Sequence, residues 1–251
     1  VRRRDKNIAF VRMHARFSAP DCHELLNTLT YDRTYIIDLT GRTPEKIAAA
    51  MPKDGRRGVK RAERVAKEAG VVIKDETGMD RATFDEVYRV LEETSERDGF
   101  TPHSADVYWT MLTTLGEQAR MYVARLDGRP VAWVLVTVNG ISSVAYYGAS
   151  TTADRATRAA EATDWYAACD LAAKGYKGYD FMGAGSTRVP ELYSVGMYKK
   201  RFAQHPTEVD GAWDVPVQRP VFEALVAAKK AKHLVRKATV VASKASEAIK
   251  R

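Results

Sequence analysis

The chain has 251 residues, 45% of them hydrophobic, and a net charge of +8, which suits one large domain or two modest ones with a sizeable core. No apolar run approaches the roughly 18–20 residues that span a bilayer, and the first residues lack the apolar segment of a signal peptide, so we expect a cytoplasmic protein. Two cysteines are too few for a disulfide scaffold, and the five histidines do not have the spacing of metal ligands. The positive net charge favours an acidic partner, which could be nucleic acid, a phosphorylated substrate or an anionic membrane surface.

The first part of the chain predicts alternating strands and helices. In chain order these are a strand over 7–14, a helix after Pro20, a strand over 34–39, a helix from Thr43, a helix over 56–69 and a strand over 71–74. Thr43 suits a helix N-cap and Pro44 the first helical position. Gly70 suits the left-handed position that ends a helix.

The rest of the chain predicts a three-strand meander set among helices. The expected elements are helices over about 80–97 and 104–117, strands over 120–126, 130–138 and 142–149, a helix over about 154–174, a strand over 178–184, a helix from about 190, a strand within 208–217 and a basic amphipathic helix over 219–250. Asp127-Gly128 and Asn139-Gly140 are tight-hairpin dipeptides, so the three meander strands should be antiparallel.

This order of elements predicts a fold class. From 71 to 218 it runs strand, two helices, three-strand meander, helix, strand, helix and strand, which is the topology of the N-acetyltransferase-like (GNAT) fold. Residues 7–75 repeat only the second half of that order: strand, helix, strand, helix and strand. We therefore predict an α+β protein with a partial GNAT-like lobe over 1–70, a complete lobe over 71–218 and a C-terminal basic amphipathic helix over 219–251.

The junction after the last meander strand bears on the acyl donor. An N-acetyltransferase of this fold binds the pyrophosphate of acetyl-CoA there, at a glycine-rich turn whose backbone N–H groups meet the phosphates. Here the junction reads YYGASTTADRATRAAE, and Gly148 is its one glycine. We predict that CoA is not a cofactor, so that the lobe uses another acyl donor or has lost catalysis.

Five stretches, taken in order, resemble the Fem peptidyl transferases of the FemX, FemA and FemB type. They are GRRGVKRAERVAKEAGVVI, SERDGF, AYYGAS, the stretch from GYKGYDFMGA, and GMYKKRF followed by DGAWDVPV. The resemblance covers roughly 30–220 and implies GNAT lobes that move an aminoacyl group from aminoacyl-tRNA to an amine of a peptidoglycan precursor. The short connection after VVIK leaves no room for the helical arm of FemA, so the FemX type is the closer match.

The resemblance also implies a catalytic pair. The family's helix carries the pattern F-K-x-x-F, and residues 198–202 fit it with Tyr198 in the first place. Lys199 then corresponds to the catalytic lysine, whose ammonium would stabilise negative charge on the carbonyl oxygen when an amine attacks the aminoacyl ester. The alternative is a row of solvated cations, which is what we expect for Lys200 and Arg201.

Tyrosines of the family's acceptor site have counterparts here. Tyr108 matches one of them, and Tyr147, or its neighbour Tyr146, matches another; each of these residues could equally serve packing. The arginine expected shortly before Tyr108 is replaced by His103-Ser104. This departure makes a nucleotide-linked muramyl peptide doubtful and leaves a lipid-linked precursor or a small non-wall peptide as acceptor.

Two helices carry basic faces. The helix over 56–69 places its cations opposite an apolar stripe of Val59, Ala62, Ala66 and Ala69, and the cations are Arg57, Lys60, Arg61, Arg64 and Lys67. That face is either solvated or a contact surface for tRNA phosphates. The C-terminal helix would bind tRNA, rest on anionic lipid at the inner face of the membrane, or brace the first lobe.

These observations favour an aminoacyl-tRNA-dependent transferase that forms a peptide bond on a peptidoglycan precursor or another small peptide acceptor, without a metal or CoA. A related transferase of natural-product peptide biosynthesis is the first alternative. A catalytically silent GNAT-like domain that binds RNA or an anionic surface is the second.

Overall fold

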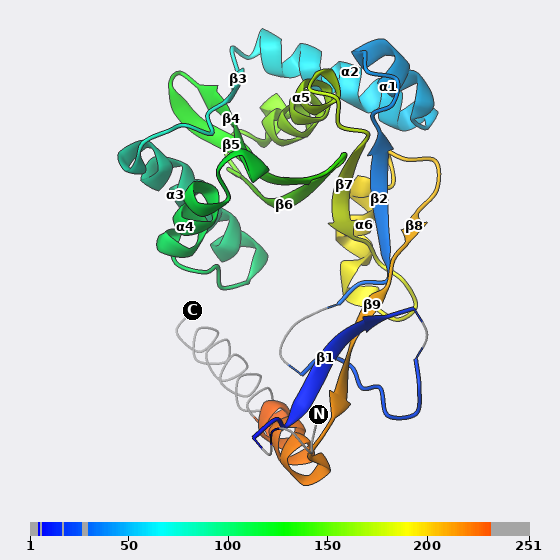
Figure 1. Ribbon diagram of the computed structural model, residues 1–251. Helices are drawn as coiled ribbons and strands as arrows, with labels where there is room; N and C mark the ends of the chain where they lie inside the picture. The colour runs from blue at the N-terminus through cyan, green and yellow to red at the C-terminus, as the bar shows by residue number, and fades with distance from the viewer. Residues whose placement is uncertain (1–4, 6, 17, 27–29, 232–251) are drawn as a thin grey trace, which may run out of the picture. The chain divides into compact units, whose positions relative to one another are not determined.

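The computed structural model describes residues 5, 7–16, 18–26 and 30–231 (Figure 1). Its contacts divide the chain into two compact units. The larger unit comprises 33–184 and 192–207, and the smaller unit draws on 1–32, 185–191 and 208–251. These units do not follow the expected lobe boundaries at 70 and 218, since the chain from 33 to 70 packs within the larger unit. The division into a partial and a complete lobe stays a prediction.

The larger unit is built on a seven-stranded sheet with the order β3-β4-β5-β6-β7-β2-β8 (Figure 1). Its strands are β2 (Arg33–Asp38), β3 (Val72–Asp75), β4 (Ala119–Leu126), β5 (Arg129–Asn139), β6 (Ser142–Ser150), β7 (Gly178–Gly183) and β8 (Thr207–Glu208). The meander of β4, β5 and β6 is antiparallel, as predicted. Gly128 and Gly140, in its two tight turns, have φ of 80° and 57°, which glycine adopts without steric cost.

Helices cover both faces of this sheet. They are α1 (Pro44–Ala50), α2 (Lys53–Glu68), α3 (Arg81–Asp98), α4 (Ala105–Leu115), α5 (Ala159–Ala173) and α6 (Tyr193–Lys199). Residues of α1, α2 and α5 pack with one set of buried strand side chains, including Tyr122 and Val136. Residues of α3 and α4 pack with the opposite set, including Met121 and Leu135. The alternation of side chains along β4 and β5 produces these two cores.

Local signals set most helix ends. The Thr43 side chain accepts a hydrogen bond from the Lys46 amide at 3.4 Å, and Gly70 has φ of 82°, so both predicted helix boundaries are confirmed. The helix expected after Pro20 is wrong, because none forms in the described residues between β1 and β2. Backbone groups of that segment bond to Asp214 instead: the His23 amide donates to the Asp214 carbonyl at 2.9 Å, and the Asp214 amide donates to the His23 carbonyl at 2.9 Å. The helix expected from 154 begins only at Ala159, after a 3₁₀ turn, η2 (Arg155–Thr157).

The smaller unit contains an antiparallel pair, β1 (Phe10–Ala15) and β9 (Gly211–Pro216). Asp214 is fully buried there and accepts hydrogen bonds from the Arg12 guanidinium at 2.8 Å and from the Leu26 amide at 2.7 Å. A helix runs from 219 to the last described residue, 231, so most of the predicted basic helix lies outside the described residues. None of the described helices combines the length and apolar content that crossing a bilayer requires.

Gly55 allows close packing between α2 and the chain after α6. A Cβ at this position would lie 1.7 Å from the backbone oxygen of Arg201. We expect Gly55→Ala to lower the free energy of unfolding by about 1–3 kcal/mol, because overpacking forces the backbone to shift. Gly58→Ala, in the same helix, is the matched control: its Cβ meets only the side-chain Oε1 of Glu161, at 2.8 Å. Equal urea midpoints for the two variants would contradict the close approach at Gly55.

Candidate active site

A cleft opens in the larger unit where β6 and β7 diverge. The two strands pair in parallel over only three residues, Ser142–Val144 against Gly178–Asp180, and separate beyond them (Figure 1). The cleft between them has a volume of about 1000 Å³. Its walls come from β6 (145–150), β7 (Phe181, Met182), α3 (Thr94, Arg97, Asp98), α5 (Ala160, Asp164) and α6 (Ser194, Val195, Tyr198, Lys199).

Each of the two diverging strands is irregular at the cleft. On β6, Ala145 faces Val136 and Tyr147 faces Leu135, which leaves Tyr146 as an extra residue. On β7, the pairing with β2 shifts around Met182, whose φ is 62°. Bulges of this kind bend a strand and redirect its side chains. They therefore aim residues of both strands into the space between them.

The bent backbone at Met182 is held by a partly buried polar cluster. The Met182 amide donates to the Asp180 carboxylate at 2.7 Å, and the Thr34 hydroxyl donates to the Met182 carbonyl at 2.8 Å. A non-glycine residue with positive φ costs free energy and persists only where its surroundings fix it. This backbone presents the next carbonyl, that of Gly183, to α6.

Lys199 extends from the end of α6 into the cleft. Its ammonium donates a hydrogen bond to the Gly183 carbonyl at 2.6 Å. Burial lowers the pKa of Lys199 to about 8, although the negative charges of Asp180 and Asp164 act to raise it. Lys200 is exposed and does not line the cleft. Adjacent residues of a helix point about 100° apart, and here that rotation separates the two lysines as expected.

Tyr198 also lines the cleft, and it contacts an acid that the sequence did not single out. The Tyr198 hydroxyl donates to one oxygen of Asp164 at 2.7 Å, and the Tyr179 hydroxyl donates to the other at 2.8 Å. Burial raises the pKa of Asp164 to about 6, and the two hydroxyl donors oppose that rise. The one signal for Asp164 in the sequence was its position in a helix composed largely of small apolar residues, α5. Its tyrosine partners lie 15 and 34 positions away, where no local pattern reveals them.

The three tyrosines expected at the acceptor site occupy two layers. Tyr146, which is 42% exposed, and Tyr147 both line the cleft. Tyr108 is only 3% exposed and does not line it. Its ring packs edge-on against Tyr147, with centroids 4.7 Å apart. Tyr108 therefore lies behind Tyr147, and the binding roles of all three tyrosines stay predictions.

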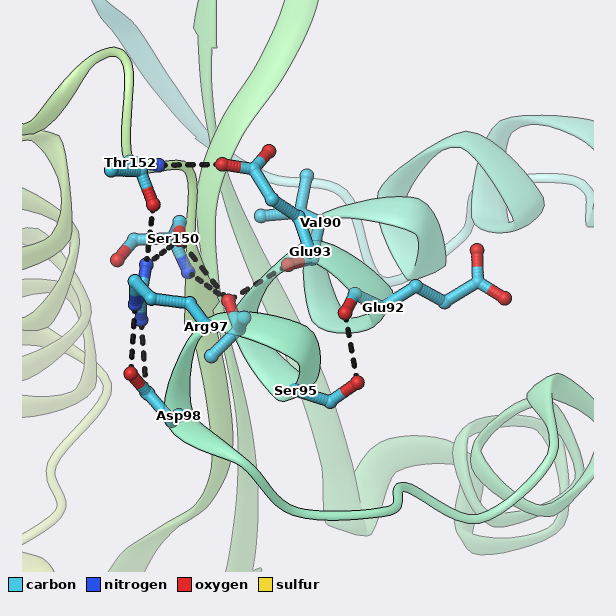
Figure 2. Close-up of polar contacts among 9 residues, drawn as sticks. Val90, Glu92, Glu93, Ser95, Arg97, Asp98, Ser150 and Thr152 are labelled. Carbon is cyan, nitrogen blue, oxygen red and sulfur yellow. Dashed lines mark hydrogen bonds and ion pairs between the residues drawn. The ribbon is translucent and has the colours of Figure 1, made fainter. Parts of the chain in front are cut away.

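The turn after β6 is surrounded by carboxylates (Figure 2). The Thr152 amide donates to the Glu93 carboxylate at 2.7 Å, and Arg97 joins the Ser150 carbonyl to the Asp98 carboxylate, with bonds of 2.8 Å to each. A pyrophosphate at the Thr152 amide would have to replace the Glu93 carboxylate, beside Asp98 and the cations Arg97 and Arg155. That CoA is not a cofactor stays a prediction.

The basic face expected on α2 points outward. Its predicted members Arg57, Lys60, Arg61 and Arg64 are all exposed, while Val59, Ala62 and Ala66 are buried. Ala69, which we expected in the buried stripe, is exposed because it lies past the last turn. Within the described part of the chain, the side chains of Arg57, Lys60 and Arg61 form no ion pair, and Arg64 pairs with Glu68 at 2.8 Å. An exposed pair of this kind contributes little to stability, so these cations remain available to an anionic partner.

Comparisons with known proteins bear on the family and the fold. A family model described as acetyltransferase (GNAT) domain matches residues 53–200. Among solved structures, FemX aligns with a TM-score of 0.66 at 16% identity, covering 85% of this chain and 68% of its own. Two lysylphosphatidylglycerol-related structures also align. One is the C-terminal DUF2156 domain of an Agrobacterium fabrum protein described as a lysylphosphatidylglycerol synthetase. It aligns with a TM-score of 0.57 at 15% identity, and the alignment covers 82% of this chain and 65% of that domain. L-PGS from Bacillus licheniformis aligns with a TM-score of 0.53 at 13% identity, and the alignment covers 80% of this chain and 66% of that protein.

These matches bear on the fold. The chain spans about two thirds of the length of each of the three structures. A comparison with curated protein sequences gave no match. The predicted GNAT-like fold with mixed helix and strand content is confirmed.

Proposed function

The chain belongs to the acetyltransferase (GNAT) domain family, and we propose that it transfers an aminoacyl group from aminoacyl-tRNA to an amine of a peptidoglycan precursor peptide. The observation that carries this proposal is the Lys199 ammonium in the cleft, on a helix that resembles the aromatic–lysine helix of the Fem peptidyl transferases. The fold shared with FemX and with lysylphosphatidylglycerol synthetase structures supports aminoacyl transfer. Among the Fem types, we propose the FemX type.

The proposed reaction needs one cation at the reacting carbonyl. The acceptor amine attacks the carbonyl carbon of the aminoacyl ester, a C–N bond forms, and negative charge develops on the carbonyl oxygen. Lys199 would stabilise that charge with its ammonium, which lies in the cleft. The bond to the tRNA ribose oxygen then breaks, and this oxygen receives the proton that the amine loses. Tyr146 and Tyr147 would contact the acceptor peptide in the same cleft.

The exposed cations of α2 would bind the tRNA. Lys and Arg side chains that contact phosphates supply most of the affinity of such complexes and release counterions on binding. The described part of the C-terminal helix adds exposed Lys229 and Lys230 in the smaller unit. We propose this helix as a second contact for tRNA or for an anionic membrane surface that carries a lipid-linked acceptor.

Acetyl-CoA should neither bind nor serve as donor. The Thr152 amide already donates its hydrogen bond to the Glu93 carboxylate, and Asp98 lies at the same turn. The negative charges of these two side chains would repel a pyrophosphate. Calorimetric titration of acetyl-CoA into the full chain should give no heat of binding. A dissociation constant in the micromolar range, which corresponds to about 8 kcal/mol of binding free energy, would contradict this expectation.

The test of function is a transfer assay with mixed substrates. A set of radiolabelled aminoacyl-tRNAs is offered with a nucleotide-linked muramyl peptide, a lipid-linked muramyl peptide and a small non-wall peptide in parallel reactions. We expect label to become peptide-bound in the lipid-linked reaction, because His103 and Ser104 stand where the family's arginine is expected. Label on the non-wall peptide alone would favour natural-product synthesis. Binding of tRNA without any transfer would favour the silent RNA-binding domain.

A further inference from the structure

Asp164 connects the three elements that form one wall of the cleft. It projects from α5, accepts the Tyr179 hydroxyl from β7 at 2.8 Å, and accepts the Tyr198 hydroxyl from α6 at 2.7 Å. Tyr179 is fully buried, so its hydroxyl has a fixed position. Tyr198 directly precedes Lys199 in α6. One carboxylate therefore links the helix that carries the lysine to the rigid core of the sheet.

Asp164 differs from several other acids of the larger unit that are at least partly buried, although Asp180 is like it in forming no ion pair among the described residues. Asp170, Glu161 and Glu76 each form an ion pair, with Lys174, Arg158 and Arg125 respectively. Asp164 forms no ion pair among the described residues, and its two hydrogen-bond donors are neutral hydroxyls. A buried carboxylate without a cationic partner costs free energy. Where such a group lines a cleft, that cost points to a function.

Charged and titratable groups near Asp164 and Lys199 come from several elements. Arg201, just after α6, lies over the Tyr198 ring at 5.0 Å and pairs with Glu161 at 3.8 Å. The titratable and charged groups that act on Asp164 are Tyr198 and Lys199 of α6, Tyr179 of β7 and Glu161 of α5, and those that act on Lys199 are Asp164 and Asp180 of β7. Elsewhere the cleft carries Arg97 and Asp98 of α3, Arg155 of η2, and Tyr146 and Tyr147 of β6. Asp164 and Asp180 are thus the two acids that counteract the effect of burial on Lys199.

We propose that Asp164 is a positioning residue for Lys199: it fixes α6 through the Tyr198 hydroxyl, and its negative charge keeps the lysine protonated inside the cleft. The link to catalysis rests on the proposed function, but the effect on the charge of Lys199 does not. Removing the Asp164 charge should lower the pKa of Lys199 below its value of about 8. Because a lysine is charged below its pKa, the ammonium would then be lost at a lower pH.

The first experiment measures the charge of Lys199 without using activity. The folded full chain is labelled with a trace of acetic anhydride at a series of pH values, and fragment mass spectra separate the labelling of Lys199 from that of Lys200. In Asp164→Asn, we expect the pKa of Lys199 to fall by about one unit, as is typical for loss of one nearby opposite charge. Asparagine can still bond both tyrosine hydroxyls, so the fold should persist.

Asp170→Asn is the matched control. Asp170 lies on the same helix and also accepts a tyrosine hydroxyl, that of Tyr122 at 2.7 Å, but does not line the cleft. We expect this variant, and the Lys200 signal in every variant, to titrate as in the parent. Tyr198→Phe removes a hydroxyl but keeps the Asp164 charge, so it should not lower the pKa of Lys199. An unchanged Lys199 titration in Asp164→Asn would overturn the proposal; if that variant does not fold, Asp164→Ser takes the same test.

The second experiment follows transfer against pH once a substrate pair is known. A fall in the pKa of Lys199 from about 8 to about 7 would reduce the charged fraction of this lysine about eightfold at pH 8.5 and less than twofold at pH 6.5. Beyond any loss that is the same at every pH, kcat of Asp164→Asn should fall by these factors relative to the parent, with KM nearly constant. A uniform loss at every pH would mean that Asp164 is only structural. A shifted labelling curve without any transfer activity would leave the charge coupling standing and refute the proposed function instead.

Discussion

Lys199→Met should reduce kcat by roughly a hundred- to thousandfold, with a modest change in KM. The substitution keeps the length and apolar stem of the side chain but removes the ammonium that lies 2.6 Å from the Gly183 carbonyl. Loss of one group that stabilises an oxyanion typically costs about 3–4 kcal/mol in the transition state. Single-turnover measurement of peptide-bond formation from aminoacyl-tRNA checks the prediction.

Lys200→Met is the control for this experiment. It removes the same charge one residue later, from a side chain that is exposed and outside the cleft, so its kcat should stay within a few-fold of the parent. Neither variant should be less stable. The lowered pKa of Lys199 means that folding disfavours its charged form, so replacement by methionine removes an unfavourable term. Equal activities for the two variants would show that the catalytic cation has been assigned to the wrong residue.

Reversing two charges on α2 should weaken tRNA binding at least tenfold near physiological salt. Lys60→Glu combined with Arg61→Glu replaces two exposed cations that have no ion pair within the described residues. The plot of log affinity against log salt should also become shallower, by about 0.7–0.9 for each phosphate that the variant no longer neutralises. The loss should be the same for every amino acid attached to the tRNA, since phosphate contacts carry no sequence information.

A control with the same change in net charge separates a local contact from general attraction. Lys74→Glu with Arg89→Glu alters two exposed cations on β3 and α3 instead. We expect this pair to reduce affinity less and to leave the salt dependence nearly unchanged. If both double variants lose affinity equally, α2 is a solvated face and the tRNA is attracted only by the overall positive charge.

Much of the fold could be predicted because its signals are local. The Asp-Gly and Asn-Gly dipeptides located the meander, and Thr43, Pro44 and Gly70 located helix ends, since each acts on backbone within a few residues. The helix expected after Pro20 failed because the backbone of His23 pairs with that of Asp214, a partner far along the sequence that no local pattern reveals. Compact units were harder to foresee, since the chain from 33 to 70 packs with elements far along the sequence.

The candidate site was predictable only in part. Lys199 and Tyr198 could be named because the resemblance rests on a short contiguous pattern, and helix geometry then separated Lys199 from Lys200. Asp164 could not be named, because its importance arises from tyrosines on two other elements. The binding role of Tyr108 stays a prediction, and the sequence does not reveal that its ring packs edge-on behind Tyr147, which lines the cleft.

The divergence of β6 and β7 also determines what binding costs. The cleft walls are hydrogen-bonded strands and packed helices, and the strained backbone at Met182 is fixed by Asp180 and Thr34. The conformational entropy of these walls is lost when the chain folds, before any substrate arrives. A bound substrate therefore has little protein to order, and such preorganisation leaves more of the intrinsic binding energy for the transition state.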